Sequence, residues 1–203
     1  MAANPNPDFT LEEYYALESA SERRWEYRDG EVVCMSGGSQ RHGRLCTRIV
    51  VNLQLAARRG TCETFTSDTA VATLSPAFPY CYPDASVACA AEFPSHQLTS
   101  GVTLDLLLNP VLIAEVVSPS SSRYDRGGKF ELYKSIPAFV EYLLIEQNER
   151  RITHWQKTAD DWIARDVTDG TVRLVSVECE LQVSDLYEGV LGSPAEPHSQ
   201  AET

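Results

Sequence analysis

Residues 110–133 read PVLIAEVVSPSSSRYDRGGKFELY, and this segment places a candidate buried strand shortly before a candidate helix. The almost continuous apolar run over residues 110–117 is typical of a strand that is covered on both faces of a sheet. A serine-rich loop with a glycine pair follows, and KFELYKSI over residues 129–136 predicts a helix. A buried strand followed by a helix predicts a layered domain in which helices cover a sheet.

The segments before this strand support the same layered fold. Residues 41–59 place Leu45, Ile49 and Leu53 four residues apart, which predicts an amphipathic helix that Gly60 ends. Residues 62–74 and 80–90 are rich in residues typical of strands, so we expect one strand in each.

Both ends of the chain carry further signals. Thr10 and Glu13 form a capping-box pattern that predicts a short helix over residues 10–20, and Asp29-Gly30 between two alternating runs predicts a β-hairpin. Strands are expected at residues 141–147 and 150–157, joined near Asn148, with more strand material after them.

Together these elements predict an α/β (α+β) fold: a mixed β-sheet flanked by helices, with an N-terminal helix and β-hairpin. We expect a single domain over residues 9–191. Residues 1–8 and 192–203 are polar and lack a periodic apolar pattern, so both segments are expected to be disordered.

Charge and apolar content exclude several classes of protein. The 203 residues carry 17 basic and 29 acidic side chains, a formal net charge of −12, which excludes a broadly basic surface for nucleic acid. A local cationic site or a metal ion that recruits phosphate stays open. No apolar run approaches the ~18 residues of a membrane-spanning helix. The first residues lack the pattern of a secretion signal, so we expect a cytoplasmic protein.

The cysteines are scattered singly and match no metal-binding spacing. With no secretion signal, we expect them to be reduced and mostly buried thiols. They are Cys34, Cys46, Cys62, Cys81, Cys89 and Cys179.

Glu115 is the one charged residue in the apolar run. Because side chains alternate along a strand, it shares a face with Ile113 and Val117, while Leu112 and Val116 lie on the other face. A carboxylate in a buried strand is costly unless it is paired or bound to a metal. Glu115 therefore fits either a buried salt-bridge partner or a metal ligand.

Two further residues become candidates for a functional site because of their relation to Glu115. Asp84 follows Pro83 in a preceding strand candidate; alone it fits a turn, but beside Glu115 it would complete the oxygen-rich pair that hard divalent ions prefer. Lys129 opens the helix after the apolar strand, four residues before Tyr133 and on the same helical face. It fits either a solvated helix terminus or a cation beside Glu115.

The combination of Pro-Asp, Glu-x-Val in an apolar strand and a lysine on the next helix resembles the PD-(D/E)XK nuclease superfamily, which has the restriction-endonuclease-like fold. In that superfamily the lysine usually stands two positions after the acid, where this chain has Val117. One branch carries the lysine on the next helix. The segments FTLEEYYALE, WEYRDGEVVCMSG, YPDASVAC and YDRGGKFELY, with the final LYEGV, are similar to the Uma-two family of that branch, from about residue 9 to residue 190.

This resemblance implies a restriction-endonuclease-like core and a set of catalytic residues. Asp84 and Glu115 would hold Mg²⁺, or Mn²⁺, together with the main-chain carbonyl of Val116. Lys129 would orient or activate water and offset phosphate charge. Glu26 resembles the acidic residue that such folds add from an N-terminal element, although a solvent-facing hairpin carboxylate is equally compatible with its sequence position.

The resemblance also suggests residues around the substrate. His42 occupies the family's histidine position at the start of the long helix, where it would contact phosphate or else cap and pack. Tyr133 is either a hydrogen-bonding residue in the cleft or part of the core. Asp125 and Arg126 are expected to organise the loop before the helix.

The implied function is a divalent-metal-dependent endonuclease that hydrolyses phosphodiester bonds in DNA and works as a homodimer, with no membrane association. Two alternatives stay open: a catalytically silent binding module of the same fold, and a metal-dependent hydrolase of a small phosphorylated substrate. Motifs of serine hydrolases, P-loop enzymes, zinc proteases and dinucleotide-binding enzymes are absent from the sequence.

Overall fold

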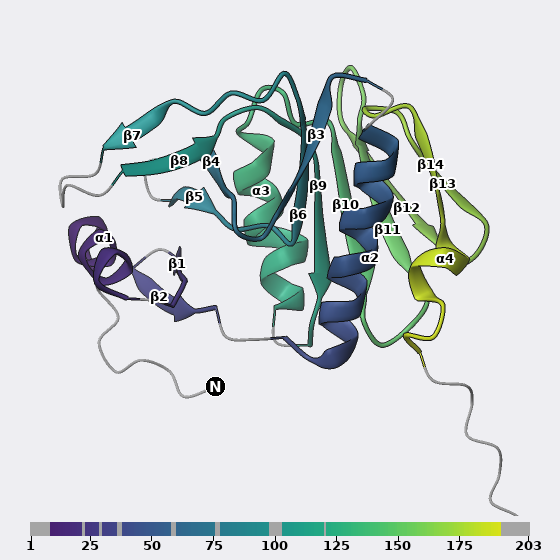
Figure 1. The fold of residues 1–203 in the computed structure, drawn as a ribbon, viewed down its shortest axis with the longest axis horizontal. Helices are drawn as coiled ribbons and strands as arrows, with labels where there is room; N and C mark the ends of the chain where they lie inside the picture. Colours follow the sequence, from purple (N-terminus) through teal and green to yellow (C-terminus); the bar gives the residue numbers. More distant parts are fainter. Residues whose placement is uncertain are drawn as a thin grey trace, which may run out of the picture.

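The apolar run forms β9, which lies inside a six-stranded mixed sheet (Figure 1). The computed structural model describes residues 9–21, 23–28, 30–35, 38–57, 60–75, 78–97, 103–119 and 121–191. The strand order is β12-β11-β10-β9-β6-β3, in which β9 and β10 are parallel and the other neighbours are antiparallel. The strands are β3 (Cys62–Thr66), β6 (Ala85–Cys89), β9 (Pro110–Val117), β10 (Glu141–Glu146), β11 (Ile152–Lys157) and β12 (Trp162–Val167).

Helices cover both faces of this sheet, as the sequence predicts. Leu112, Ala114 and Val116 of β9 pack in one core with α2 (Gln40–Ala57), while Ile113 and Val117 pack in another with α3 (Lys129–Lys134). The expected alternation along β9 is therefore confirmed. The first core also takes in residues of the hairpin β13 (Thr171–Leu174) and β14 (Cys179–Gln182) and of α4 (Val183–Tyr187).

The predicted helix of residues 41–59 is confirmed as α2. Leu45, Ile49 and Leu53 are all buried against the sheet, because a four-residue spacing keeps them on one face of the helix. The helix ends at Ala57, and the Gly60 N–H donates to its carbonyl.

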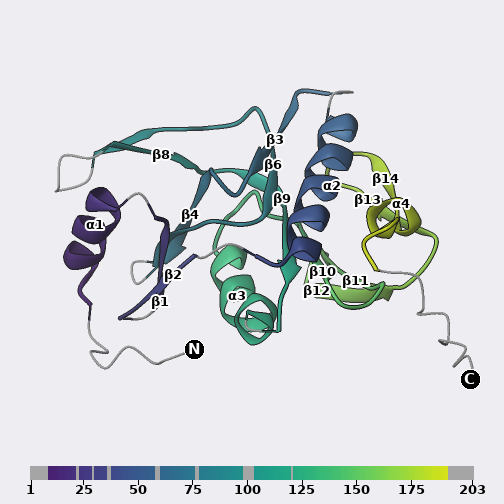
Figure 2. The same ribbon diagram turned by 60° about the horizontal axis from the view of Figure 1, so that its bottom comes forward.

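A second layer of structure lies at one end of the sheet (Figures 1 and 2). The predicted N-terminal helix and hairpin are confirmed as α1 (Leu11–Ala20), with the Thr10–Glu13 capping box, and as antiparallel β1 (Trp25–Arg28) and β2 (Glu31–Cys34). Their aromatic residues pack against a small sheet of order β5-β4-β8-β7. Its strands are β4 (Ala70–Ser75), β5 (Phe78–Cys81), β7 (Ser95–Gln97) and β8 (Thr103–Leu107).

The expectation of one strand each in residues 62–74 and 80–90 is wrong. A turn after Thr66, closed by the Thr69 N–H to the Thr66 carbonyl, separates β3 from β4, and Pro83 separates β5 from β6. Proline has no N–H to donate to a ladder, so the chain changes sheets at this point. Asp84 consequently lies in a bend just before β6 rather than inside a strand.

The segment YDRGG is also not the loop that the sequence suggests. Tyr124–Gly128 forms a π-helical turn, η1, that continues directly into α3. Gly128 permits it, because a Cβ there would lie 2.7 Å from Cδ2 of the Tyr124 ring. The turn brings Asp125 and Lys129 to the same side of the helix. Single π turns within α-helices often occur at functional sites.

The expectation of reduced cysteines is wrong for one pair. Cys62 and Cys89 are directly opposite in the β3–β6 ladder and form a disulfide. The other cysteines of the described residues, which lie outside this disulfide, are Cys34, Cys46, Cys81 and Cys179.

The predicted disorder of residues 1–8 and 192–203 lies outside the described residues. Among the helices that are described, none has both the length and the apolar character needed to cross a membrane.

Candidate active site

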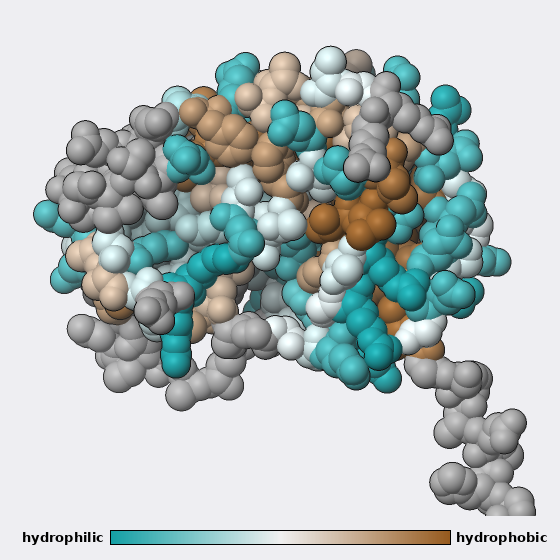
Figure 3. All heavy atoms as spheres, in the orientation of Figure 1, coloured by the Kyte–Doolittle hydropathy of each residue, from teal (hydrophilic) through white to brown (hydrophobic). Residues whose placement is uncertain are grey.

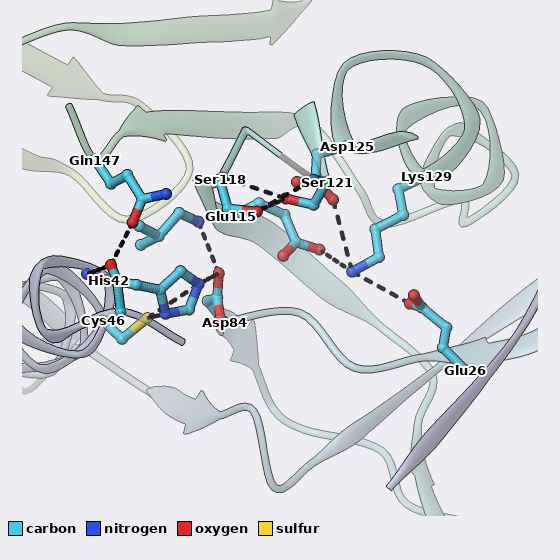
Figure 4. A network of polar contacts seen from close by, with 12 residues as sticks. Glu26, His42, Cys46, Asp84, Glu115, Ser118, Ser121, Asp125, Lys129 and Gln147 are labelled. Atoms are coloured by element: carbon cyan, nitrogen blue, oxygen red, sulfur yellow. Dashed lines mark hydrogen bonds and ion pairs between the residues drawn. The ribbon is translucent and has the colours of Figure 1, made fainter. Parts of the chain in front are cut away.

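A cleft of about 470 Å³ opens where β9 ends, and it gathers acidic side chains from four parts of the chain. Glu115 comes from β9, Asp84 from the bend before β6, Glu26 from β1, and Asp125 from η1 (Figure 4). The rest of the lining consists of Val33, Cys34, Met35, Gly38, Ser39, His42, Tyr82, Val116, Ser118, Pro119, Ser121, Lys129 and Gln147.

The sheet brings Asp84 next to Glu115. Strands β6 and β9 are antiparallel neighbours with Ala85 opposite Ala114, so the residue before Ala85 lies beside the residue after Ala114. Asp84 Oδ2 accepts a hydrogen bond from the Val116 N–H at 2.7 Å, which fixes the carboxylate against the end of β9. Two carboxylates, one from β9 and one from the bend just before β6, thus face the same cleft.

Lys129 lies at the centre of the acidic group. Its Nζ is 3.0 Å from Glu115 Oε1, 3.2 Å from Glu26 Oε1 and 3.9 Å from Asp125 Oδ1, and the side chain is only 4% exposed. Burial alone would lower the pKa of Lys129, but the neighbouring carboxylates, Glu115 first, raise it well above its ordinary value. The ammonium therefore stays charged.

At Glu115 the charged form is disfavoured, because burial and repulsion outweigh the attraction of Lys129. Burial, with added repulsion from Asp125, Asp84 and Glu26, raises its pKa to about 8 although Lys129 opposes the shift. Its Oε1 accepts hydrogen bonds from Lys129 and from the Tyr133 hydroxyl, the latter at 2.8 Å. Four acidic side chains thus crowd around one lysine, and a bound divalent cation would favour the charged form of Glu115.

His42 lies at the side of the cleft, one helical turn before Cys46. Its Nε2 is 3.4 Å from Asp84 Oδ2, and its Nδ1 is 3.3 Å from the Cys46 sulfur. The hydrogen bond with Asp84 raises the pKa of His42 despite its burial. Burial alone would raise the pKa of Asp84, but hydrogen bonds from His42 and the Val116 N–H hold it below its usual value.

The structure therefore brings Asp84, Glu115, Lys129 and Glu26 together. Glu26 is 1% exposed, which excludes the solvent-facing alternative for this residue. Tyr133 is fully buried and its hydroxyl donates to Glu115, so it both packs in the core and hydrogen-bonds at the acidic group, but it is not among the residues that line the cleft.

The other residues expected at the site have more varied positions. Val116 lines the cleft, and the contact observed for its main chain is the N–H bond to Asp84. His42 faces Asp84. Arg126 lies in η1 rather than in a loop, and its ion pair with Glu146 connects this helical turn to the end of β10.

Sequence reasoning missed Asp125 as a member of the acidic group. It is 3% exposed and lines the cleft. The available signal was its position four residues before Lys129, which places both on one helical face once η1 is helical.

Cys46 and Gln147 were missed as well. Cys46 follows His42 by four residues on α2, a spacing visible in the sequence. Gln147 follows β10, and its side-chain oxygen accepts from the Ser39 hydroxyl at 2.6 Å. No local pattern pointed to Gln147, because the partner is more than a hundred residues away.

Comparisons with known proteins identify a family and relatives of this chain. Residues 11–184 match the model of the Uma2 family, described as "Putative restriction endonuclease". Two uncharacterized proteins of Synechocystis sp. are similar. One, slr1290, is 31% identical over 92% of this chain and 95% of its own, and the other, sll1609, is 35% identical over 76% and 84%.

A solved structure shares the fold. The crystal structure of a "putative nuclease belonging to DUF820" from Anabaena variabilis has a TM-score of 0.69 and 19% sequence identity, over 90% of this chain and 99% of the other. At this level of identity the likeness concerns the fold.

Proposed function

The chain belongs to the Uma2 family, and from this premise we propose that it is a divalent-metal-dependent endonuclease that hydrolyses phosphodiester bonds in DNA. The observation that carries the proposal is the open cleft in which buried Glu115, Glu26 and Asp125 surround one buried lysine, with the partly exposed Asp84 beside Glu115. Buried acidic groups with shifted pKa values beside a cleft are typical of catalytic sites.

The donor set suits a hard cation. Glu115 on β9 and Asp84, just before the neighbouring strand β6, offer carboxylate oxygens side by side, and Glu26 adds another that shares Lys129 with Glu115. All-oxygen donors favour Mg²⁺ or Mn²⁺ over softer metals. The excess of buried negative charge over Lys129 supports the same choice, because uncompensated buried carboxylates are costly.

In the proposed reaction the chain's own residues position the charges. A divalent ion held by Asp84 and Glu115, with the Val116 carbonyl as a further ligand, would polarise the phosphoryl group and lower the pKa of a bound water. Lys129, fixed by three carboxylates, presents an ammonium that stabilises the charge developing on the phosphate oxygens. Tyr133 holds Glu115 in place through its hydroxyl.

His42 is proposed to face the substrate from the other side of the cleft. It pairs with Asp84 and lines the opening, so a protonated imidazole there would attract a phosphate oxygen. The raised pKa of His42 favours that protonated form.

The test is nicking of supercoiled plasmid DNA with Mg²⁺, with Mn²⁺ and with a chelator. We expect nicking only with an added ion, and a loss of about a hundredfold or more in Asp84→Asn, because a carboxylate ligand becomes a neutral amide. Glu131→Gln is the matched control, since Glu131 lies on α3 but is exposed and pairs with Lys134. Ion-independent nicking, or full activity in Asp84→Asn, would contradict the proposal.

Cleavage of a duplex needs two cuts, and two copies of the chain can make one cut each, so we propose a homodimer. Sedimentation of the full chain with and without DNA is the measurement. A monomer under both conditions would exclude paired cutting by a stable dimer.

A further inference from the structure

A second group of side chains next to the acidic cleft differs from it in chemistry. His42 and Cys46 lie on successive turns of α2, and both face Asp84 (Figure 4). The potential ligand atoms of these three residues all lie within 4.8 Å of one another. An imidazole, a thiol and a carboxylate form a mixed donor set, in contrast to the oxygen donors around Lys129.

We propose that His42, Cys46 and Asp84 form a binding site for Zn²⁺, and that zinc held there competes with the catalytic divalent ion for Asp84. The competition rests on the proposed function, because only that function places a second ion on Asp84. The zinc site itself rests on the geometry of the three side chains alone.

The spacing of the donor atoms fits tetrahedral coordination. Zn–N and Zn–O distances near 2.1 Å and a Zn–S distance near 2.3 Å place tetrahedral ligand atoms roughly 3.3–3.7 Å apart. His42 Nε2 is 3.4 Å from Asp84 Oδ2 and 4.0 Å from the Cys46 sulfur. The spacing between His42 and Asp84 already fits, whereas the Cys46 sulfur lies nearer to Nδ1, at 3.3 Å, so the Cys46 side chain would have to turn toward Nε2 to complete the three-ligand arrangement.

The backbone near His42 restricts the position of this side chain. Gly38 approaches the His42 ring so closely that a Cβ there would lie 2.6 Å from Nδ1. The Ser39 hydroxyl accepts a hydrogen bond from the His42 N–H at 3.1 Å and donates one to Gln147, which anchors the start of α2. The ring is thus held facing Asp84 by contacts on two sides.

The site is also accessible. His42, Cys46 and Asp84 are each partly exposed. All three line a second hollow beside the acidic cleft, in which His42 and Asp84 are shared lining residues. An ion could therefore enter without opening the core.

The donor types decide which metal is preferred. A thiolate and an imidazole select Zn²⁺ over Mg²⁺, whereas the carboxylates beside Lys129 select the hard ion. Zinc binding would release the Cys46 thiol proton to solvent, because a coordinating thiol is deprotonated by the metal. Zinc thus prefers the site with the thiolate and imidazole, and the hard ion prefers the site with the carboxylates. Asp84 is the ligand that both ions would use.

Co²⁺ is the first probe, because thiolate coordination gives it a charge-transfer absorption in the near ultraviolet that oxygen ligands do not give. We expect this band in the parent protein and its loss in Cys46→Ser, with zinc affinity by calorimetry reduced at least tenfold. Cys179→Ser is the matched control, since Cys179 is a partly exposed thiol on β14 that lines neither the acidic cleft nor the second hollow. Thermal unfolding checks that each variant folds.

A parent protein without the band, or a Cys46→Ser variant that keeps it, would overturn the zinc site. Competition is measured separately, by whether one equivalent of Zn²⁺ releases bound Mn²⁺ in the parent but not in Cys46→Ser. Retention of Mn²⁺ in the zinc-loaded parent would overturn the competition. A parent that never binds Mn²⁺ and never nicks DNA would refute the proposed function, and with it the competition, while the Co²⁺ band still decides the zinc site.

Discussion

Two buried glutamates on adjacent strands of one sheet have opposite electrostatic properties. Glu141 on β10 is fully buried and accepts hydrogen bonds from the Val175 and Ser176 N–H groups, with His154 and the Ser176 hydroxyl completing its partners. Burial raises its pKa, but these partners outweigh burial and leave the pKa below its ordinary value. Glu115 on β9, with Lys129 and Tyr133 against three other carboxylates, has a pKa raised to about 8.

The difference distinguishes a carboxylate buried for stability, Glu141, from one buried at a candidate functional site, Glu115. Donors from the chain satisfy Glu141, so its cost of burial is already offset within the fold. Glu115 lines a cleft and lacks that full set of donors. Burial of its carboxylate therefore destabilises the folded state unless a cation binds. Mutations and pH should therefore affect the two residues in different ways.

The largest expected effect is on activity at Glu115. Glu115→Gln should lower plasmid nicking by about a thousandfold, because it removes a charged ligand and the partner of Lys129. Its melting temperature without metal should stay equal to that of the parent or rise, since a repulsive carboxylate is gone. A large drop in melting temperature would place Glu115 in the same structural class as Glu141.

The next effect is on stability at Glu141. Glu141→Ala leaves two part-buried N–H groups and the buried His154 without their acceptor, and should reduce the free energy of unfolding by about 3–5 kcal/mol. Urea unfolding followed by tryptophan fluorescence measures it. Glu131→Ala, an exposed glutamate, should change stability by less than about 0.5 kcal/mol. Similar losses in both variants would contradict the role given to the Glu141 partners.

Measured without metal, the contributions of Glu141 and Glu115 to stability should change with pH in opposite directions. Because the pKa of Glu141 is lowered, its contribution is present above its ordinary value of 4.5 and is lost as the pH falls through the lowered pKa. Because the pKa of Glu115 is raised, the folded state keeps a proton that the unfolded state loses, so stability falls between pH 4.5 and about 8.

Melting temperatures of the parent, Glu115→Gln and Glu141→Gln across this pH range test both signs. The advantage of the parent over Glu141→Gln should shrink toward acid pH. The parent should lose stability relative to Glu115→Gln as the pH rises. Parallel curves for all three proteins would mean that neither carboxylate has a shifted pKa.

The smallest effect is expected at Tyr133. Tyr133→Phe removes only the hydroxyl that donates to Glu115 Oε1, and should cost about 1 kcal/mol of stability. Nicking should fall several-fold, with an unchanged apparent affinity for Mn²⁺ in titrations. A loss as large as that of Glu115→Gln would indicate that the tyrosine takes part in the chemistry directly.

Elements with a clear periodic pattern could be predicted from the sequence. The apolar run of β9, the buried face of α2 and the capping box of α1 each depend on residues within a few positions of one another. The site residues Asp84, Glu115 and Lys129 were found because they lie in or next to such elements. The breaks after Thr66 and at Pro83 were missed, because strand propensity does not show where a chain changes sheets.

By itself the sequence determined the strand that carries Glu115, the side of that strand on which it lies, and the helical face shared by Lys129 and Tyr133. These features follow from local periodicity, which the backbone geometry of strands and helices imposes. Only the tertiary structure decided that Asp125 and Glu26 join the acidic cleft, that Cys46 and His42 meet Asp84, and that Glu141 is satisfied while Glu115 is not. The physical reason is that the pKa of a buried carboxylate depends on its neighbours in space, and strand pairing brings those neighbours from distant parts of the chain.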